Sequence, residues 1–119
     1  MSTDQHLDVS ERDDMTIVRF KGCRLLVDAL VVNGVGRELG DLASGQDCRT
    51  LIVDFAGVED VSSAVLGLLV MLRKKMAFKK GQLVLCGLSP EVREFCDETM
   101  LSQLFEIRET EADAFVALV

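Results

Sequence analysis

The sequence predicts one α/β domain, built on a mixed and mostly parallel sheet with about four helices. Short apolar runs typical of strands alternate along the chain with segments of helical periodicity, which is the pattern of βαβ units. The chain of 119 residues has the size of one domain, and 49% apolar with 28% charged residues is an ordinary globular composition. We therefore expect a polar N-terminal segment at residues 1–14 and a single folded domain at residues 15–119.

The first predicted strand is MTIVRFKG at residues 15–22, in which apolar and polar side chains alternate as in a half-buried strand. Leu7 and Val9 precede it across ERDD, so the N-terminal segment is expected to supply a hairpin partner at the edge of the sheet. Residues 24–27, RLLV, predict a second short strand.

A helix is expected next, because four apolar residues fall on one helical face before Gly45. They are Val31, Val35, Leu39 and Leu42. Residues 49–55, RTLIVDF, form a continuous apolar run with β-branched residues, which predicts a central strand covered on both faces. Residues 56–61, AGVEDV, are expected to form the loop that follows it.

A long helix is predicted to open at Ser62 and Ser63 and to run to about Lys79, with Gly81 as its stop signal. Its second half carries a basic cluster, whose positive charge interacts favourably with the helix dipole. The cluster comprises Arg73, Lys74, Lys75, Lys79 and Lys80.

The last third of the chain predicts two more strands and two more helices. Residues 82–87, QLVLCG, form a buried strand, and Ser89 followed by Pro90 caps a helix. That helix is expected to bury Val92, Phe95 and Cys96. A short strand at LFEI, residues 104–107, leads to Thr110, which opens the final helix with Asp113 three residues on. The apolar face of this helix is predicted to hold Ala112, Phe115, Val116 and Val119.

Charge and hydropathy exclude several classes of function. The formal net charge of −7 repels nucleic acids and anionic lipid surfaces. The longest apolar run, at residues 65–72, is far shorter than a membrane span, and the N-terminus lacks the basic start and apolar middle of a secretion signal. We expect a cytoplasmic protein with no nucleic-acid or membrane partner, present as a monomer or weak dimer.

The sequence predicts no catalytic residue, metal site or cofactor. His6, the one histidine, lies in the polar N-terminal segment, which leaves a serine or cysteine nucleophile without its usual base. The four cysteines form no CxxC pair, and Cys86 and Cys96 are interpreted as small buried hydrophobes. An acidic pocket near Glu59 and Asp60, binding a small ligand or performing catalysis, is kept as an alternative, although solvated loop carboxylates are more common.

The strand-to-helix segment VEDVSSAVLG carries two hydroxyl groups at a helix N-terminus. One interpretation is capping, in which a serine side chain accepts a hydrogen bond from a free backbone N–H and stabilises the helix by about 1 kcal/mol. The other is phosphorylation, because a helix N-terminus tolerates an anion and a phosphate adds about −1.5 to −2 charges. A modified serine would then keep the fold and disturb a docked partner.

These residues resemble the STAS domain, and above all bacterial anti-sigma-factor antagonists. In LIVDFAGVEDVSSAVLGLL, residues 51–69, an apolar strand ending in Asp leads to SSAVLG, which aligns with the DSSGLG-type motif of the family. Ser62 falls where Asp commonly stands and Ser63 where the phosphorylated serine stands. The similarity continues through KKGQLVLCGLSPEVREFCDETMLSQLFEIRETEADAF, so it covers nearly the whole chain.

The resemblance implies an α/β fold and a partner-switching role in the control of transcription. An anti-sigma factor that is also a serine kinase would bind the protein and phosphorylate Ser63, or alternatively Ser62, and a PP2C-type phosphatase would restore it. ATP and metal would belong to those partners. The residues expected to contact the partner are Asp60, Val61, Ser62, Ser63, Ala64 and Val65.

Two departures from the motif leave a second hypothesis open. Ser62 replaces the usual Asp, and Val65 replaces the Gly that follows the serines. A β-branched Val65 is expected to stiffen the helix start and enlarge its surface. The alternative is therefore a STAS scaffold module of a larger signalling assembly, which binds its partner without switching.

Overall fold

The architecture is described from a computed structural model, which covers residues 7–12, 15–21, 25–26, 28–45 and 48–118. A five-stranded sheet forms its centre, with one antiparallel edge and parallel pairing elsewhere. In sheet order the strands are β1 (Leu7–Arg12), β2 (Met15–Phe20), β4 (Thr50–Asp54), β6 (Gln82–Cys86) and β7 (Glu106–Arg108). The mixed, mostly parallel sheet and the hairpin partner at the N-terminus are both confirmed.

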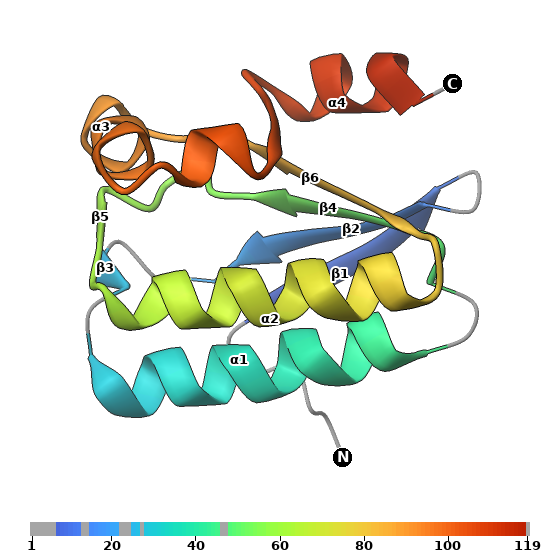
Figure 1. The fold of residues 1–119 in the computed structure, drawn as a ribbon, viewed down its shortest axis with the longest axis horizontal. Coiled ribbons are helices and arrows are strands. Elements are labelled where there is room, and N and C mark those ends of the chain that lie inside the picture. Colours follow the sequence, from blue (N-terminus) through green and yellow to red (C-terminus); the bar gives the residue numbers. More distant parts are fainter. Residues whose placement is uncertain (1–6, 13–14, 22–24, 27, 46–47, 119) are drawn as a thin grey trace.

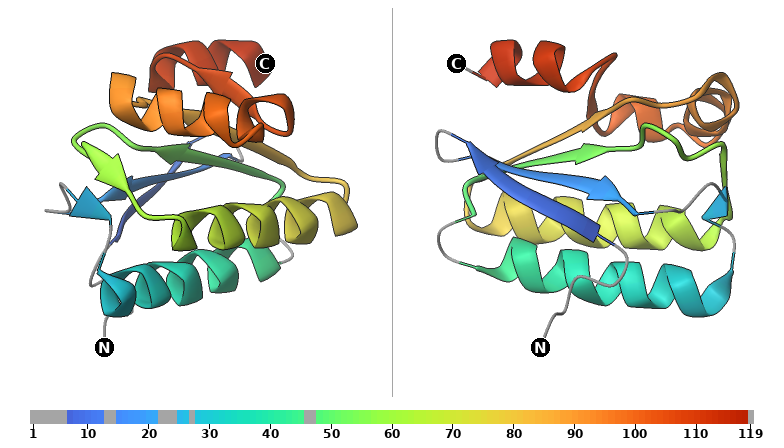
Figure 2. Two further views of the ribbon diagram at one scale, coloured as in Figure 1. Left: turned by 60° about the vertical axis from the view of Figure 1, so that its left-hand side comes forward. Right: turned by 180° about the vertical axis from the view of Figure 1, so that it is seen from behind.

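Helices cover both faces of this sheet (Figure 1). They are α1 (Ala29–Ser44), α2 (Ala64–Phe78), α3 (Pro90–Glu98) and α4 (Glu111–Leu118). Helices α1 and α2 lie side by side across one face, whereas α4 lies on the opposite face (Figures 1 and 2). Helix α3 lies at the end of the sheet, beside the start of α2. The predicted set of four helices is therefore confirmed.

A second, two-stranded sheet lies at the same end of the molecule as the start of α2 (Figure 2). Strand β3 (Leu25–Leu26) pairs in parallel with β5 (Asp60–Val61). The strand predicted at residues 24–27 is thus present at Leu25–Leu26, and residues 24 and 27 lie outside the described residues. The last two residues of the loop predicted at residues 56–61 instead form β5. A strand of two residues is too short to leave a recognisable pattern in the sequence. This small sheet fixes the backbone immediately before Ser62.

The prediction that β2 is half-buried is wrong. Met15, Thr16, Ile17 and Val18 are all buried, because both faces of the strand are covered. Val18 belongs to the main core under α1 and α2, while Met15 and Ile17 form a second cluster with residues of α4. The alternation of apolar and polar residues predicted that Thr16 faces solvent. The pattern does not indicate that this face of the strand is covered as well.

Helix α1 ends at Gly45 as predicted, but its buried face is rotated. The buried side chains are Val32, Val35, Leu39 and Ala43. Val31 and Leu42, also predicted for this face, are partly buried and pack against the same core, so they lie at its margin. The cause is α2, which approaches where α1 has no side chain: a Cβ on Gly36 would lie 3.4 Å from the Leu68 side chain.

Helix α2 was expected to end at Gly81, but the residue with the left-handed backbone is the one before it. Lys80 adopts the left-handed conformation, with φ of 60°. Gly81 is needed for a different reason, because a Cβ there would lie 2.7 Å from the carbonyl oxygen of Arg49. Its N–H donates to the carbonyl of Met76 at 2.7 Å, which closes the helix end.

The basic cluster at the end of α2 holds other helix ends in place. The Lys75 ammonium donates to the Ser44 hydroxyl at 3.1 Å, and the Lys79 ammonium donates to the carbonyl of Gly45 at 2.5 Å. Arg73 donates to the carbonyl of Leu104 at 3.0 Å. Positive charge is thus placed at the C-terminus of α1, whose own last turn has no basic residue.

The C-terminal third follows the predicted order with shifted boundaries. A short 3-10 helix, η1 (Leu101–Gln103), delays the last strand, so β7 begins at Glu106 instead of residue 104. Helix α4 opens as predicted, with the N–H of Asp113 donating to Thr110 Oγ1 at 3.1 Å.

The predicted apolar face of α4 is right at Phe115 but wrong at Ala112 and Val116. Ala114 is fully buried, while Ala112 and Val116 are exposed; Val119 lies outside the described residues. Phe115 is partly buried and packs against the second core cluster. The buried residue Ala114 is small and the helix has only eight residues, so its sequence carries little periodic signal.

Candidate functional site

The serine pair lies at the start of α2, behind a loop that the core holds firmly. Strand β4 passes into this loop at Phe55, whose N–H donates to the carbonyl of Cys86 at 2.8 Å. Phe55 and Val58 are buried, and Gly57 between them turns the chain with φ of +89°. The loop therefore presents residues 59–63 from a rigid base.

Ser63 is exposed and immediately precedes the first residue of α2, in the N-cap position. Its backbone is helical, with φ of −63° and ψ of −19°, and its hydroxyl makes no capping hydrogen bond. A capping residue ordinarily needs extended backbone angles so that its side chain turns back over the first turn. The capping interpretation is therefore wrong for Ser63, and its hydroxyl faces solvent.

The six residues predicted to contact a partner divide into two sets. Asp60, Ser63 and Ala64 are exposed and Ser62 is half-buried, so these four form surface. Val61 and Val65 are 7% and 1% exposed and point into the core. The expectation that Val65 enlarges the helix surface is wrong, because this side chain fills space behind the serine pair.

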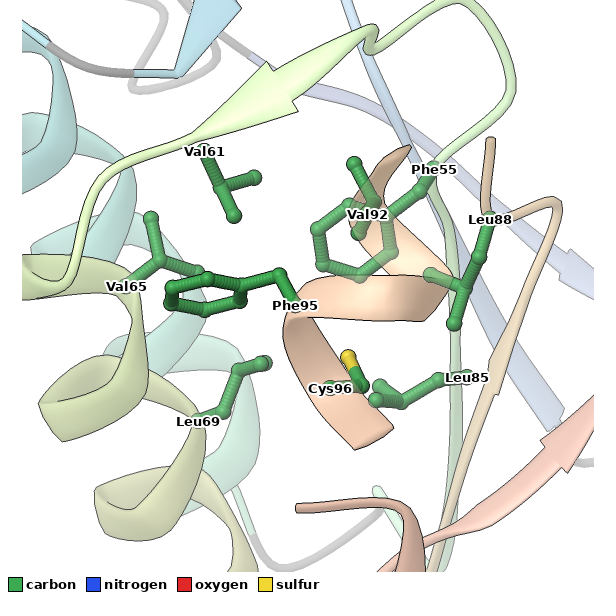
Figure 3. Close-up of a pocket in the computed structure, with 9 residues that line it drawn as sticks. All are labelled: Phe55, Val61, Val65, Leu69, Leu85, Leu88, Val92, Phe95 and Cys96. Atoms are coloured by element: carbon green, nitrogen blue, oxygen red, sulfur yellow. The ribbon is translucent and has the colours of Figure 1, made fainter. Parts of the chain in front are cut away.

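Figure 3 shows what Val61 and Val65 do. Both point toward Phe95 of α3, which lies against Val65 and Leu69 in an apolar pocket. The other lining residues are Phe55, Leu85, Leu88, Val92 and Cys96. All nine lining side chains lack charge, so the serine pair is supported by packing between the start of α2 and α3.

The alternative of an acidic pocket receives no support from this geometry. Glu59 and Asp60 are exposed, and the pocket beside them is lined by apolar residues. Within the described ranges, no group of three or more His, Cys, Asp or Glu side chains could hold a metal ion. His6, Cys23, Asp13 and Asp14 lie outside those ranges.

Comparison with known proteins identifies the family and the fold. The STAS domain family matches residues 6–114. The chain belongs to the STAS domain family. It is 33% identical over 92 residues to BtrV of Bordetella bronchiseptica, a candidate anti-sigma factor antagonist, and this match covers 71% of the chain and 79% of BtrV.

Solved anti-sigma-factor antagonists share the fold of this STAS domain. The STAS protein of Planctomyces limnophilus superposes with a TM-score of 0.84 at 24% identity, covering 93% of this chain and 96% of that one. SpoIIAA in its unphosphorylated form superposes with a TM-score of 0.78 at 18% identity, covering 94% and 95%. Among the described residues, no helix is both long and apolar enough to cross a membrane.

Ser89 ties the serine-bearing loop of this STAS domain to α3. As predicted it caps α3, accepting from the N–H of Val92 at 3.1 Å. Its hydroxyl also donates to the carbonyl of Glu59 at 3.1 Å, which joins the loop before β5 to the start of α3. One side chain therefore holds both elements that flank the pocket.

We expect Ser89→Ala to lower the free energy of unfolding by about 1 to 2 kcal/mol, because a helix cap and a loop hydrogen bond are lost together. Urea denaturation monitored by circular dichroism measures this difference. Ser63→Ala provides the comparison, since its hydroxyl makes no capping bond, and it should change stability by less than about 0.5 kcal/mol. Equal losses in the two variants would contradict the assigned roles.

The cysteines of this STAS domain behave as buried hydrophobes. Cys48, Cys86 and Cys96 are free and buried, as predicted for the last two. Burial raises the pKa of the Cys86 thiol to about 12, and it also raises the pKa of the Cys96 thiol. Both thiols therefore stay protonated and unreactive at neutral pH.

A charged cluster at the carboxyl end of β4 was not predicted. Arg19 of β2 forms a two-pronged ion pair with Glu111 of α4, with Nη2 lying 2.6 Å from Oε1. Asp54, the last residue of β4, is 7% exposed and lies beside Arg19 in the sheet register, and its Oδ1 accepts from the N–H of Ala56 at 2.9 Å. The available sequence signal was an acidic residue at the end of a mostly apolar strand, but nothing local indicated that Arg19 and Glu111 lie near it.

Proposed function

We propose that this STAS domain is an anti-sigma-factor antagonist whose hold on an anti-sigma factor is released by phosphorylation of Ser63, with Ser62 as the alternative acceptor. The observation that carries the proposal is the exposed Ser63, whose hydroxyl makes no capping bond, immediately before the first residue of α2. A kinase can reach such a hydroxyl without unfolding the helix. Ser62 is half-buried and is therefore the less accessible of the two.

The fold is expected to tolerate a phosphate at this position. The first turn of α2 carries no acidic side chain, and a helix N-terminus favours negative charge. A partner seated over Ser63 would instead have to bury the new charge or face it at close range. A loss of about 2.8 kcal/mol of binding free energy corresponds to a hundredfold weaker complex.

The partner surface in this proposal comprises the exposed residues around the hydroxyl. Asp60, Ser62, Ser63 and Ala64 make the contacts, while Val61 and Val65 hold them in position from the core. The partner is an anti-sigma factor that acts as a serine kinase, and a PP2C-type phosphatase reverses the modification. Nucleotide and metal belong to these two proteins, and the exchange takes place in the cytoplasm with this chain a monomer or weak dimer.

Two comparisons support this assignment. The relative BtrV is a candidate anti-sigma factor antagonist. The chain also shares the fold of Bacillus SpoIIAA, whose structure was solved in the phosphorylated form. The latter superposes with a TM-score of 0.71 at 18% identity over 95% of this chain and 99% of that one. The existence of a phosphorylated protein with this fold supports the proposal that this chain is also phosphorylated.

Phosphate mapping tests the proposal. The protein is incubated with its cognate kinase and ATP, and the modified peptide is sequenced by mass spectrometry. We expect a single phosphate on Ser63, and none in Ser63→Ala unless Ser62 substitutes as acceptor. Absence of phosphate on both serines, with a kinase active on a control substrate, would leave the scaffold hypothesis in place.

A further inference from the structure

Leu30, at the start of α1, is an exposed apolar residue. Its side chain is 82% exposed, and its backbone N–H donates to the Asp28 carboxylate at 2.8 Å. This capping bond fixes Leu30 in the first turn of the helix. Single exposed apolar side chains are common on protein surfaces, so exposure alone assigns no function. What assigns a function to Leu30 is its position relative to the serine pair.

Helices α1 and α2 run side by side in the same direction, with their starts at the same end of the molecule (Figures 1 and 2). A Cβ on Gly36 would lie 3.4 Å from the Leu68 side chain, and the Lys75 ammonium donates to the Ser44 hydroxyl at 3.1 Å. A residue of α1 is therefore level with the residue 31 or 32 positions later in the chain. In this register Leu30 is level with the serine pair.

Leu30 also lies on the side of α1 that faces α2. At about 100° per residue it falls about 40° from Ser44, which contacts α2. On α2, Ala64 falls about 20° from both Met71 and Lys75, whose side chains approach α1. Ala64 is nevertheless exposed, so this side of α2 is uncovered at its start. Leu30 and Ala64 therefore border one patch of surface beside the serine pair.

Gly67 is a second exposed residue of this patch whose type the fold does not require. It lies one helical turn after Ser63, on the same face of α2. A Cβ there would meet nothing within 4 Å, and its φ is not positive. Glycine inside a helix lowers stability relative to alanine. Loss of helix stability without a gain in packing is typical of sites where another backbone comes close.

The four surface residues of the serine-bearing segment are too few for a stable protein complex. A specific interface buries about 800 Å² on each partner, spread over about 20 residues. A protein seated over the serine pair must therefore extend onto neighbouring elements. On α3 the exposed side chains are mostly charged, at Glu91, Arg93, Glu94 and Asp97. The centre of an interface is poor in charged residues, which favours extension toward α1.

We propose that the anti-sigma factor covers the starts of both α1 and α2, with Leu30 as the apolar anchor of the contact and Gly67 as its point of closest approach. The inference rests on the proposed function and adds α1 to its surface. The partner chemistry that fits is an apolar pocket for Leu30 beside a backbone segment that passes over Gly67. A phosphate on Ser63 would then lie in a contact that excludes water, where a charge is most costly to bury.

Two substitutions test this surface in the unphosphorylated full chain. Leu30→Ala and Gly67→Leu should each weaken binding to the anti-sigma factor by about thirtyfold in isothermal titration calorimetry. Leu30→Ala should leave the urea midpoint unchanged, because the side chain is exposed. Gly67→Leu should raise the midpoint, because leucine is the better helix former and its side chain enters open space. Lower affinity without lower stability separates lost contacts from misfolding.

Matched controls make the same kinds of change away from the patch. Val116→Ala trims an exposed apolar side chain on α4, on the opposite face of the sheet, and Gly40→Ala adds a methyl group to a buried helical glycine. Both should bind like the unaltered protein. Normal affinity of Leu30→Ala or Gly67→Leu would overturn the inference and leave the Ser63 switch intact. If the unaltered protein did not bind the anti-sigma factor, the proposed function would fall and the inference with it.

Phosphorylation kinetics give an independent measurement. Leu30→Ala should raise the KM of the kinase for this chain by about thirtyfold with kcat unchanged, because an anchor remote from the hydroxyl binds the ground state and the transition state equally. An unchanged KM would overturn the anchor role. Sedimentation velocity tests the other occupant, a second copy of the chain. Self-association that Leu30→Ala abolishes, with affinity for the anti-sigma factor unchanged, would assign the patch to that copy and overturn the inference.

Discussion

Ser63→Asp should weaken binding to the anti-sigma factor by about a hundredfold while the free energy of unfolding changes by less than about 0.5 kcal/mol. The new carboxylate lies on an exposed helix start, where the dipole favours it in the free protein. In the complex the same charge must be desolvated or placed against the partner. Isothermal titration calorimetry gives the dissociation constants, and urea denaturation gives the stability.

Two variants separate position from charge in that experiment. Ser63→Ala removes the hydroxyl without adding charge and should bind as tightly as the unaltered protein. Ala77→Asp adds the same side chain to an exposed site at the other end of α2, about 20 Å away. It should also bind normally. Equal affinity of Ser63→Asp and Ala77→Asp would favour a scaffold that does not switch.

Gly87→Ala should destabilise the protein by about 4 kcal/mol, the largest stability loss that we expect from a single methyl group. Gly87 follows β6 with φ of +70°, and a Cβ there would lie 2.2 Å from Asp54 Oδ1 and 2.8 Å from the backbone nitrogen of Ala56. The methyl group would therefore strain the turn and push the buried carboxyl away from its donor. Urea denaturation measures the loss.

Gly57→Ala isolates the part of this loss that comes from backbone strain alone. Gly57 also has a positive φ, of +89°, but a Cβ there would meet nothing within 4 Å. We expect a loss of about 1 kcal/mol for this variant. If Gly87→Ala cost no more than Gly57→Ala, close packing between Gly87 and Asp54 would be refuted.

Local signals in the sequence were sufficient to predict the order of the four helices and the main strands, without β5 and η1, and the position of the serine pair. Continuous apolar runs predicted β4 and β6, and the Ser89 and Thr110 caps predicted the starts of α3 and α4, because a cap acts within one helical turn. The start of α2 was predicted from the serines themselves, although Ser63 does not cap it.

What the sequence could not predict depends on contacts between distant segments. The covered face of β2 depends on α4, and the rotated face of α1 depends on the approach of Leu68 to Gly36. Arg19 and Glu111 are 92 positions apart, so neither residue signals the other locally. Val65 was assigned to the surface because it departs from a family motif, whereas its burial follows from Phe95 on α3.

Whether negative charge at Ser63 decides partner binding is tested most directly with the native modification. The protein is phosphorylated by its cognate kinase, separated from the unmodified form, and both forms are titrated into the anti-sigma factor in the absence of ATP. We predict that the phosphorylated form binds about a hundredfold more weakly and regains full affinity after treatment with a PP2C-type phosphatase. Indistinguishable dissociation constants for the two forms would contradict the switch.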